Sequence, residues 1–188
     1  ALRAAEIAIP FKDRILGQTV SDNLVRFQST GVCQFCDLSN TDLRGIDLHD
    51  ADLRRAHLSG ANLSATDLRR AKLTRAKLTD VDLTAADLSM AILSGTNLTK
   101  ADLTGANLYG ANLTWANLTG ADLSAANLVG TILTGVDLTE AILTNTNLTG
   151  VDLTGAILTN TNLIGAILRG ANLSHTNLEG QNFSGQDL

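Results

Sequence analysis

Two cysteines three residues apart offer the most evident chemistry in this chain of 188 residues. Cys33 and Cys36 form a C-x-x-C pattern, which suits half of a metal site, a redox pair, a local disulfide or two small core residues. A structural zinc ion would need about two more ligands. His57, however, falls at an outward position of the repeat described below, and His49 and His175 lie in other coils. No metal site is therefore expected, and both packed thiols and a structural disulfide remain open.

The carboxylates, hydroxyls and glycines recur with a fixed period, which argues for a structural role. Asp or Asn stands at the same position in 23 of 31 five-residue units, and Ser or Thr commonly follows two residues later. No His meets these residues in a nucleophile arrangement, and the glycines never form the cluster that cradles phosphate. We therefore expect no enzymatic activity and no cofactor.

Composition indicates a folded chain with an acidic end. Apolar residues make up 44% of the chain but aromatic residues only 3%, a narrow composition typical of repeats. Residues 81–188 carry two basic and nine acidic side chains, a net charge of −7, which argues against direct nucleic-acid binding there. No apolar run approaches the roughly 18 residues of a membrane span. The chain starts at Ala1, and no targeting peptide is expected within it.

A leucine recurs at every fifth residue from Leu38 to Leu188, with Phe183 as the single substitute, which makes 31 units without a slip. That period fits neither a helix nor a simple strand, whose faces recur about every 3.6 and 2 residues. A small or β-branched residue stands two positions before the Leu in nearly every unit. The resulting apolar, polar, apolar triplet predicts a short strand with two inward side chains.

The two residues after each triplet must turn the chain, since otherwise the next triplet would bury nothing. Gly fills the second turning position 14 times, which suits left-handed backbone angles. Four such corners close a coil of twenty residues, so the units would form nearly eight coils stacked about 4.8 Å apart, a rod about 37 Å long. The same position also holds residues with side chains, so we expect that the corner does not require left-handed angles: Arg55, Arg70, Lys100 and Trp115.

The A-(D/N)-L-(S/T)-G pattern resembles that of the pentapeptide repeat family over about four fifths of the chain. This resemblance implies an all-β fold, a right-handed quadrilateral parallel β-helix for residues 36–188. The lead-in from Ser29 to Leu38 is similar to that of exported bacterial, often cyanobacterial, members. It implies the periplasm or the thylakoid lumen as the compartment rather than the cytoplasm.

Residues 1–35 break the period and are expected to form an N-terminal cap, because a stack of coils exposes its terminal edge. Ser21 precedes a short apolar segment, which predicts a capped helix over the first coil. At the other end the inward positions become Gln181 and Gln186, as in a terminal coil that partly contacts water. The last coil is therefore expected to be frayed, truncated or covered by another molecule.

Two groups of outward residues depart from the repeat. The first group is a cluster of seven basic residues, which we call the basic band: Arg54, Arg55, Arg69, Arg70, Lys72, Arg75 and Lys77. It is either a site for an acidic partner or lipid headgroups, or a solvated surface balanced by nearby Asp residues. The balancing residues are Asp47, Asp50, Asp52 and Asp67. The second group is predicted to project from two adjacent walls: Met90, Ile92, Tyr109, Trp115, Val129 and Ile132. Exposed aromatic residues beside Ile anchor interfaces, but outward Ile can also serve only as a strand former.

The leading hypothesis is a rigid, non-enzymatic module for protein interaction or structure, since the predicted fold fixes walls of side chains and offers no pocket. Its partner would be a protein that the sequence does not identify. Self-association end to end, through the open C-terminal coil, is an alternative form of the same hypothesis.

A rival hypothesis is a DNA mimic that inhibits or protects a topoisomerase, as some members of the family protect DNA gyrase. Duplex DNA carries one charge per about 1.7 Å, or about 15 over the ~26 Å spanned by residues 81–188, against a net charge of −7 here. The gyrase-directed members also tend to carry loops that break the coil and a C-terminal dimer module, which the unbroken repeat does not contain. These differences place mimicry second.

Overall fold

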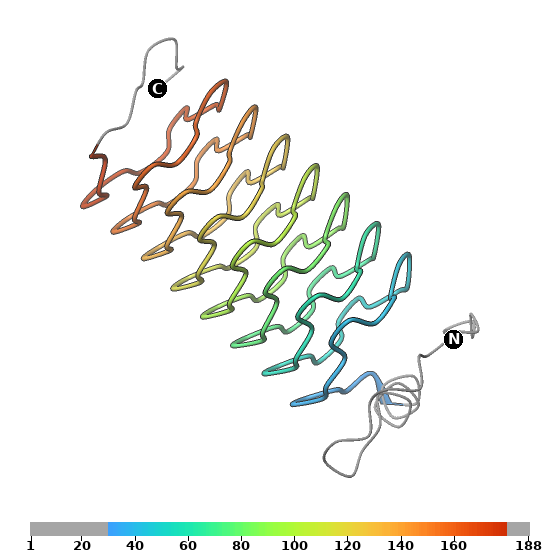
Figure 1. The fold of residues 1–188 in the computed structure, drawn as a ribbon. Helices are drawn as coiled ribbons and strands as arrows, with labels where there is room; N and C mark the ends of the chain where they lie inside the picture. The colour runs from blue at the N-terminus through green and yellow to red at the C-terminus, as the bar shows by residue number, and fades with distance from the viewer. Residues whose placement is uncertain (1–29, 180–188) are drawn as a thin grey trace.

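The computed structural model describes residues 30–179, which form a stack of coils that advances as a straight rod (Figure 1). Within these residues Thr30 alone is helical, and no strand exceeds a single bridged residue. The three-residue strands expected from the sequence are therefore shorter than predicted. The reason is that a turn flanks each triplet on both sides, so only the central residue pairs as a strand with the coils above and below.

Bridges between residues twenty positions apart run in four parallel series, so each coil has four sides. We number the sides by their central residues: wall 1 runs from Val32 to Asn172, wall 2 from Asp37 to Asn177, wall 3 from Asp42 to Asn162 and wall 4 from Asp47 to Ile167. The first bridge joins Val32 to Asp52. Coiling in the described residues thus begins four residues before the boundary at residue 36 that the repeat suggested.

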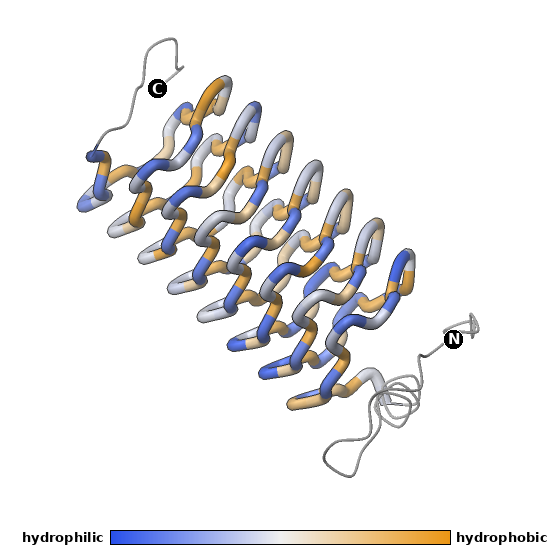
Figure 2. Tube along the Cα trace, in the orientation of Figure 1, coloured by the Kyte–Doolittle hydropathy of each residue, from blue (hydrophilic) through white to orange (hydrophobic). Residues whose placement is uncertain are grey.

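A column of leucines fills the interior of the rod. Each Leu of the repeat from Leu38 to Leu168 is at most 5% exposed, and Ala, Val or Thr residues lie beside it. Figure 2 shows hydrophobic and hydrophilic residues following one another along every coil. The buried Thr hydroxyls are satisfied by leucine carbonyls, as where Thr131 donates to Leu108 in the preceding coil at 2.8 Å. The core is therefore nearly the same in every coil.

Every corner from Phe35 to His175 contains a residue with positive φ, between +52° and +71°. The following N–H donates to the leucine carbonyl three residues earlier, as in a type II turn. The corner residue's own N–H commonly donates to the next coil, so stacking holds the left-handed angle whatever the side chain. The expectation that the corner does not require this angle is wrong, since φ is 57° to 59° at the four residues on which it rested, Arg55, Arg70, Lys100 and Trp115.

The Asp or Asn at the centre of a wall completes the hydrogen bonding of its repeat. In the repeat from Asp82 to Ala86, two N–H groups donate to the next coil, one donates to the preceding coil and one closes the turn. The remaining N–H, that of Thr84, donates to Asp82 Oδ1 at 2.9 Å. Every Asp and Asn at the centre of a wall from Asp37 to Asn177 accepts the same bond, at 2.8–3.4 Å. A central Ile or Lys gives this bond up, because neither side chain has an acceptor.

The two ends of the rod extend beyond the described residues. The expected cap lies outside them except for residues 30–35, and so does the predicted helix after Ser21. Gln181 and Gln186 also lie outside. In the last described coil, Ala171, Leu173 and Leu178 are only partly buried, unlike their counterparts in the middle of the rod.

Candidate interaction surface

The six residues of the predicted apolar group gather on wall 1 and its two corners. Ile92 and Ile132 are central residues of wall 1, on either side of Asn112. Met90, Tyr109 and Val129 lie at the corner where wall 4 turns into wall 1, and Trp115 lies at the corner between walls 1 and 2. The sequence placed this group on two adjacent walls. The structure places it on a single wall with its corners, which we call the apolar surface.

Trp115 is the most prominent member of the apolar surface. Its side chain is 71% exposed, and its ring lies over Gly135 in the next coil, where an added Cβ would overlap the ring. Met90 lies over Gly110 in the same way. Since corners with and without Gly share the same φ, these two glycines are needed for the space that they leave. Trp115 and Met90 are thus each accommodated by the absence of a side chain one coil further on.

Ile92 and Ile132 each forgo the hydrogen bond that a central Asp or Asn accepts, and each is 41% exposed. A central residue that is neither buried nor an acceptor for the backbone N–H of its repeat lowers the stability of the folded coil slightly. Ile142, Ile157 and Ile167 share this property on walls 3, 2 and 4. Only on wall 1 do such residues adjoin exposed aromatic side chains in the described part of the rod.

Three arginines of the basic band are neutralised by neighbouring carboxylates. Their guanidinium groups pair with Asp residues at 2.5–2.6 Å, as Arg54 with Asp52, Arg69 with Asp67 and Arg70 with Asp50. Arg54 first, and Gln34 as well, holds the pKa of Asp52 at about 2. The pKa of Asp67 is lowered by Arg69, and that of Asp50 by Arg70. For these three arginines the balanced, solvated interpretation of the band fits the structure.

The other four cations gather around the corner between walls 1 and 2, which we call the cationic corner. Arg55 lies over the ring of Phe35, 5.4 Å from its centroid, and Arg75 follows one coil later. Lys72 and Lys77 flank Arg75 on walls 1 and 2. Among the described residues, no carboxylate lies within 4.0 Å of these four charges. Lys72 bridges to Ile92, so the cationic corner adjoins the apolar surface.

Cys33 and Cys36 are joined by a disulfide, and both are buried. Cys33 occupies a leucine position of the first coil and Cys36 the inward position before Leu38. The bond therefore closes the first corner of the rod, between walls 1 and 2. Of the interpretations left open by the sequence, the structure contains the structural disulfide.

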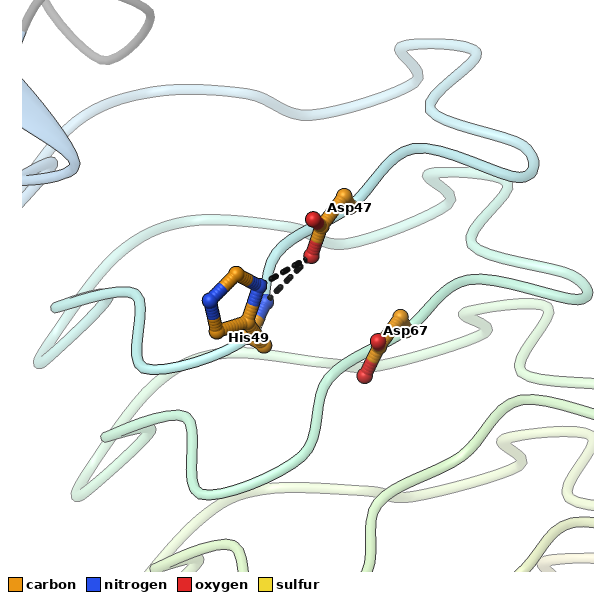
Figure 3. Close-up of side chains that lie close together, drawn as sticks. All are labelled: Asp47, His49 and Asp67. Atoms are coloured by element: carbon orange, nitrogen blue, oxygen red, sulfur yellow. Dashed lines mark hydrogen bonds and ion pairs between the residues drawn. The ribbon is translucent and has the colours of Figure 1, made fainter. Parts of the chain in front are cut away.

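Asp47, His49 and Asp67 converge on wall 4 (Figure 3). Sequence reasoning missed this cluster because, as candidate metal ligands, it compared the histidines only with the cysteines. The ligand atoms of the cluster lie within 4.8 Å of one another, so they could in principle contact one cation. His49 Nδ1, however, already contacts Asp47, and Asp67 pairs with Arg69. A twenty-residue interval between two Asp residues is the signal that could have found the cluster.

A surface depression of about 390 Å³ lies beside this cluster, at the corner between walls 4 and 1. His49, Arg69, Arg70, Ser89 and Met90 line it. Its two arginines are already paired with carboxylates, so it presents no free charge from these residues. Within residues 30–179, no helix has the length and apolar character needed to cross a membrane.

Residues 36–75, 76–114, 116–155 and 146–185 match the family of pentapeptide repeats, in eight copies. A trypsin-treated variant of QnrB1, a plasmid-mediated fluoroquinolone resistance protein, has a similar structure with a TM-score of 0.69 over 82% of each chain at 23% identity. This likeness shows the fold, a β-helix solenoid.

Two further solved structures are similar mainly in sequence. HetL, a pentapeptide repeat protein involved in heterocyst differentiation regulation in the cyanobacterium Nostoc sp. strain PCC 7120, is 30% identical, with 84% of this chain and 94% of that chain covered and a TM-score of 0.30. A thylakoid-lumen pentapeptide repeat protein of Arabidopsis thaliana is 28% identical, with 66% and 75% covered and a TM-score of 0.34. No curated protein matches the chain. The family match over residues 36–185, together with the repeat and the stacked coils, shows that the chain belongs to the pentapeptide repeat family.

Proposed function

We propose that this chain is a non-enzymatic solenoid that serves as a rigid protein-interaction module, and that the apolar surface on wall 1 is where a protein partner binds. The observation that carries the proposal is that Trp115, Tyr109 and Met90, all more than half exposed, lie at the two corners of the wall that carries Ile92 and Ile132. Aromatic residues and Met are enriched in protein interfaces, and Trp and Tyr are among the residues that supply most of the binding energy. The rest of the repeat is explained by the core, the corners and the hydrogen bonds of the coil.

The rigidity of the rod supports this role. Consecutive coils are joined by hydrogen bonds of 2.7–3.4 Å along every wall, so the outward side chains keep a fixed spacing. A prepared surface of this kind loses little conformational entropy on binding. The buried disulfide at the first corner fits an oxidising compartment, such as the periplasm or the thylakoid lumen.

The test replaces Trp115 and Tyr109 together by Ala. We expect an unchanged circular dichroism spectrum, because both side chains lie outside the core, and binding of a partner or of a second copy weakened by at least about tenfold. The matched control replaces Ile157 and Ile164, which are also exposed but lie on wall 2 and on the corner between walls 3 and 4. Unchanged association of the aromatic variant in light scattering and pull-down would contradict the proposal.

A second candidate is a DNA-mimicking inhibitor or protector of DNA gyrase or another topoisomerase. It draws on the fold shared with a fluoroquinolone resistance protein and on wall 3, where Asp82, Asp102 and Asp122 follow one another in adjacent coils. The cationic corner counts against it, because those charges would repel a DNA-binding site. Inhibition or quinolone protection in a supercoiling assay with purified gyrase, at micromolar protein, would put mimicry first.

A further inference from the structure

Wall 1 has a self-complementary order of central residues. One coil on either side of Asn112 stands an Ile, Ile92 before it and Ile132 after it. Two coils on either side stand opposite charges, Lys72 before it and Asp152 after it. With coils about 4.8 Å apart, the Ile pair lies about 5 Å and the charged pair about 10 Å from Asn112. A half-turn about Asn112 therefore brings Ile onto Ile and Lys onto Asp.

Both charges are available to a second molecule. Lys72 is exposed, with no carboxylate within 4.0 Å among the described residues. Asp152 accepts hydrogen bonds from neutral donors only, the Thr134 and Thr154 hydroxyls, the Thr154 N–H and the Asn172 amide. In the described part of the rod it has no ion pair. Each charge can thus gain a partner without breaking an existing pair.

The corner between walls 1 and 2 has a matching symmetry. Trp115 stands between two corners without a side chain, Gly95 one coil before and Gly135 one coil after. Its ring leans over Gly135. In an antiparallel pair the ring of each copy would face the flat corner at Gly95 of the second copy, so the two rings fit side by side.

We propose that wall 1 binds a second copy of this chain, face to face and antiparallel, about a two-fold axis that passes through Asn112. Such an interface is isologous, so each contact occurs twice, including the pair between Lys72 and Asp152 of the second copy. The inference rests on the proposed function, which makes wall 1 the interaction surface, and deepens it by naming the partner.

The charges on the four walls favour wall 1 as the interface and an antiparallel arrangement of the two copies. A parallel pair on wall 1 would set Lys72 against Lys72 of the second copy. Wall 3 presents Asp82, Asp102 and Asp122 in succession, which would repel an identical wall. Wall 2 also has a Lys before and an Asp after its middle, Lys77 and Asp137, but the residues between them are polar. Among the four walls of the described rod, wall 1 alone has two Ile residues between its opposite charges.

The available area predicts a weak dimer. From Asp52 to Asn172 wall 1 extends over seven rungs, about 29 Å, and with its corners it is roughly 20 Å wide. A footprint of roughly 600 Å² on each copy buries about 1,200 Å² in total, the lower limit of stable interfaces. We expect a dissociation constant of about micromolar order.

A charge swap followed by sedimentation velocity on the whole chain tests the pairing. Lys72→Asp and Asp152→Lys each place like charges together twice in the interface, so each is expected to weaken the dimer by at least about tenfold. The double variant restores opposite charges and is expected to return to within about threefold of the original. Lys77→Asp and Asp137→Lys make the same changes on wall 2 and should leave the dimer intact.

A cysteine on the two-fold axis gives an independent readout. Asn112→Cys should be linked into a covalent dimer by a short bis-maleimide reagent, because facing walls stand about 10 Å apart, too far for a direct disulfide. Asn117→Cys, in the same coil but on wall 2, should not be linked. A chain that stays monomeric at about 100 μM, or a dimer insensitive to both charge changes, as end-to-end contact would give, overturns the proposal. If the chain is monomeric and the Trp115 and Tyr109 variant still loses binding to another protein, the dimer fails and the proposed function stands.

Discussion

Two regions of the rod, residues 42–80 and residues 81–135, share the same buried core but differ in the side chains on their surface. Both regions bury Leu at every fifth residue to within a few per cent of full burial. Outside, the first region is crowded with charges, many in ion pairs, whereas the second carries the exposed Met, Tyr, Trp and Ile residues of wall 1. Because the buried core is the same under both kinds of surface, the outward residues can change without a change of fold.

The largest expected effect tests the part that the two regions share. Leu68→Ala and Leu113→Ala each remove a fully buried side chain, one from each region, and should each lower the free energy of unfolding by about 3 kcal/mol. Denaturant titration monitored by circular dichroism measures both. A difference of more than about 1 kcal/mol between them would mean that the two interiors are not equivalent.

A smaller effect tests how the second region accommodates Trp115. Gly135→Ala brings a Cβ into the Trp115 ring and should cost about 2 kcal/mol, whereas Gly155→Ala, which meets no atom within 4 Å, should cost about 1 kcal/mol from its left-handed angle alone. Adding Trp115→Ala to Gly135→Ala should remove the additional loss of stability seen at Gly135. An equal loss of stability in the Gly135 and Gly155 variants would show that the Trp115 ring does not need the space at Gly135.

Acid should lower the stability contributed by the ion pairs, which lie in the first region. The folded-state pKa of Asp52 is lowered to about 2 by Arg54, so its contribution is complete above its unfolded pKa near 4 and is lost as pH falls from about 4 to 2. We expect Asp52→Asn to lower stability at pH 7 by about 1 kcal/mol, since Arg54 is half exposed to solvent. The variant and the original should converge near pH 2. A constant gap from pH 7 to pH 2 in thermal melts would contradict this assignment.

The smallest effect concerns the apolar residues of wall 1 themselves. Ile132→Asn restores an acceptor for the Thr134 N–H and should raise the free energy of unfolding by about 0.5 kcal/mol while weakening association. Ile157→Asn on wall 2 makes the same repair and should leave association unchanged. Loss of stability in both variants, with association unchanged in both, would show that outward Ile is kept as a strand former and carries no binding role.

Much of the fold was predictable because one period controls it. The position of Leu38 and its successors predicts the core, the twenty-residue coil and the stacking, and the structure agrees at each Leu of the repeat from Leu38 to Leu168. The left-handed angle at Arg55 and Trp115 was not predictable from the residue type, because the coils impose it through hydrogen bonds between residues about twenty positions apart. The reason for the central Asp and Asn residues likewise appears only once the other four N–H groups of the repeat have partners.

The sequence predicts which residues lie on the surface, but not which of them lie together or form ion pairs. The sequence identifies Met90, Ile92 and Trp115 as departures from the repeat, yet their gathering around one wall depends on which corner each occupies. The division of the basic band depends on side-chain direction, since Arg54 turns to Asp52 while Arg55, its neighbour, lies over Phe35. Neighbours in the chain can point along different walls, and residue spacing alone does not distinguish them.

The central claim is that molecules associate through the apolar surface of wall 1, and the fluorescence of Trp115 tests it most directly. Trp115 is the only Trp in the chain, it is 71% exposed, and it lies in the middle coil of that surface, at the corner with wall 2. As protein concentration rises through the range in which sedimentation detects association, its emission should shift to shorter wavelength and its quenching by acrylamide should fall. Association with Trp115 still fully open to the quencher would contradict the account, because the molecules would then be meeting elsewhere.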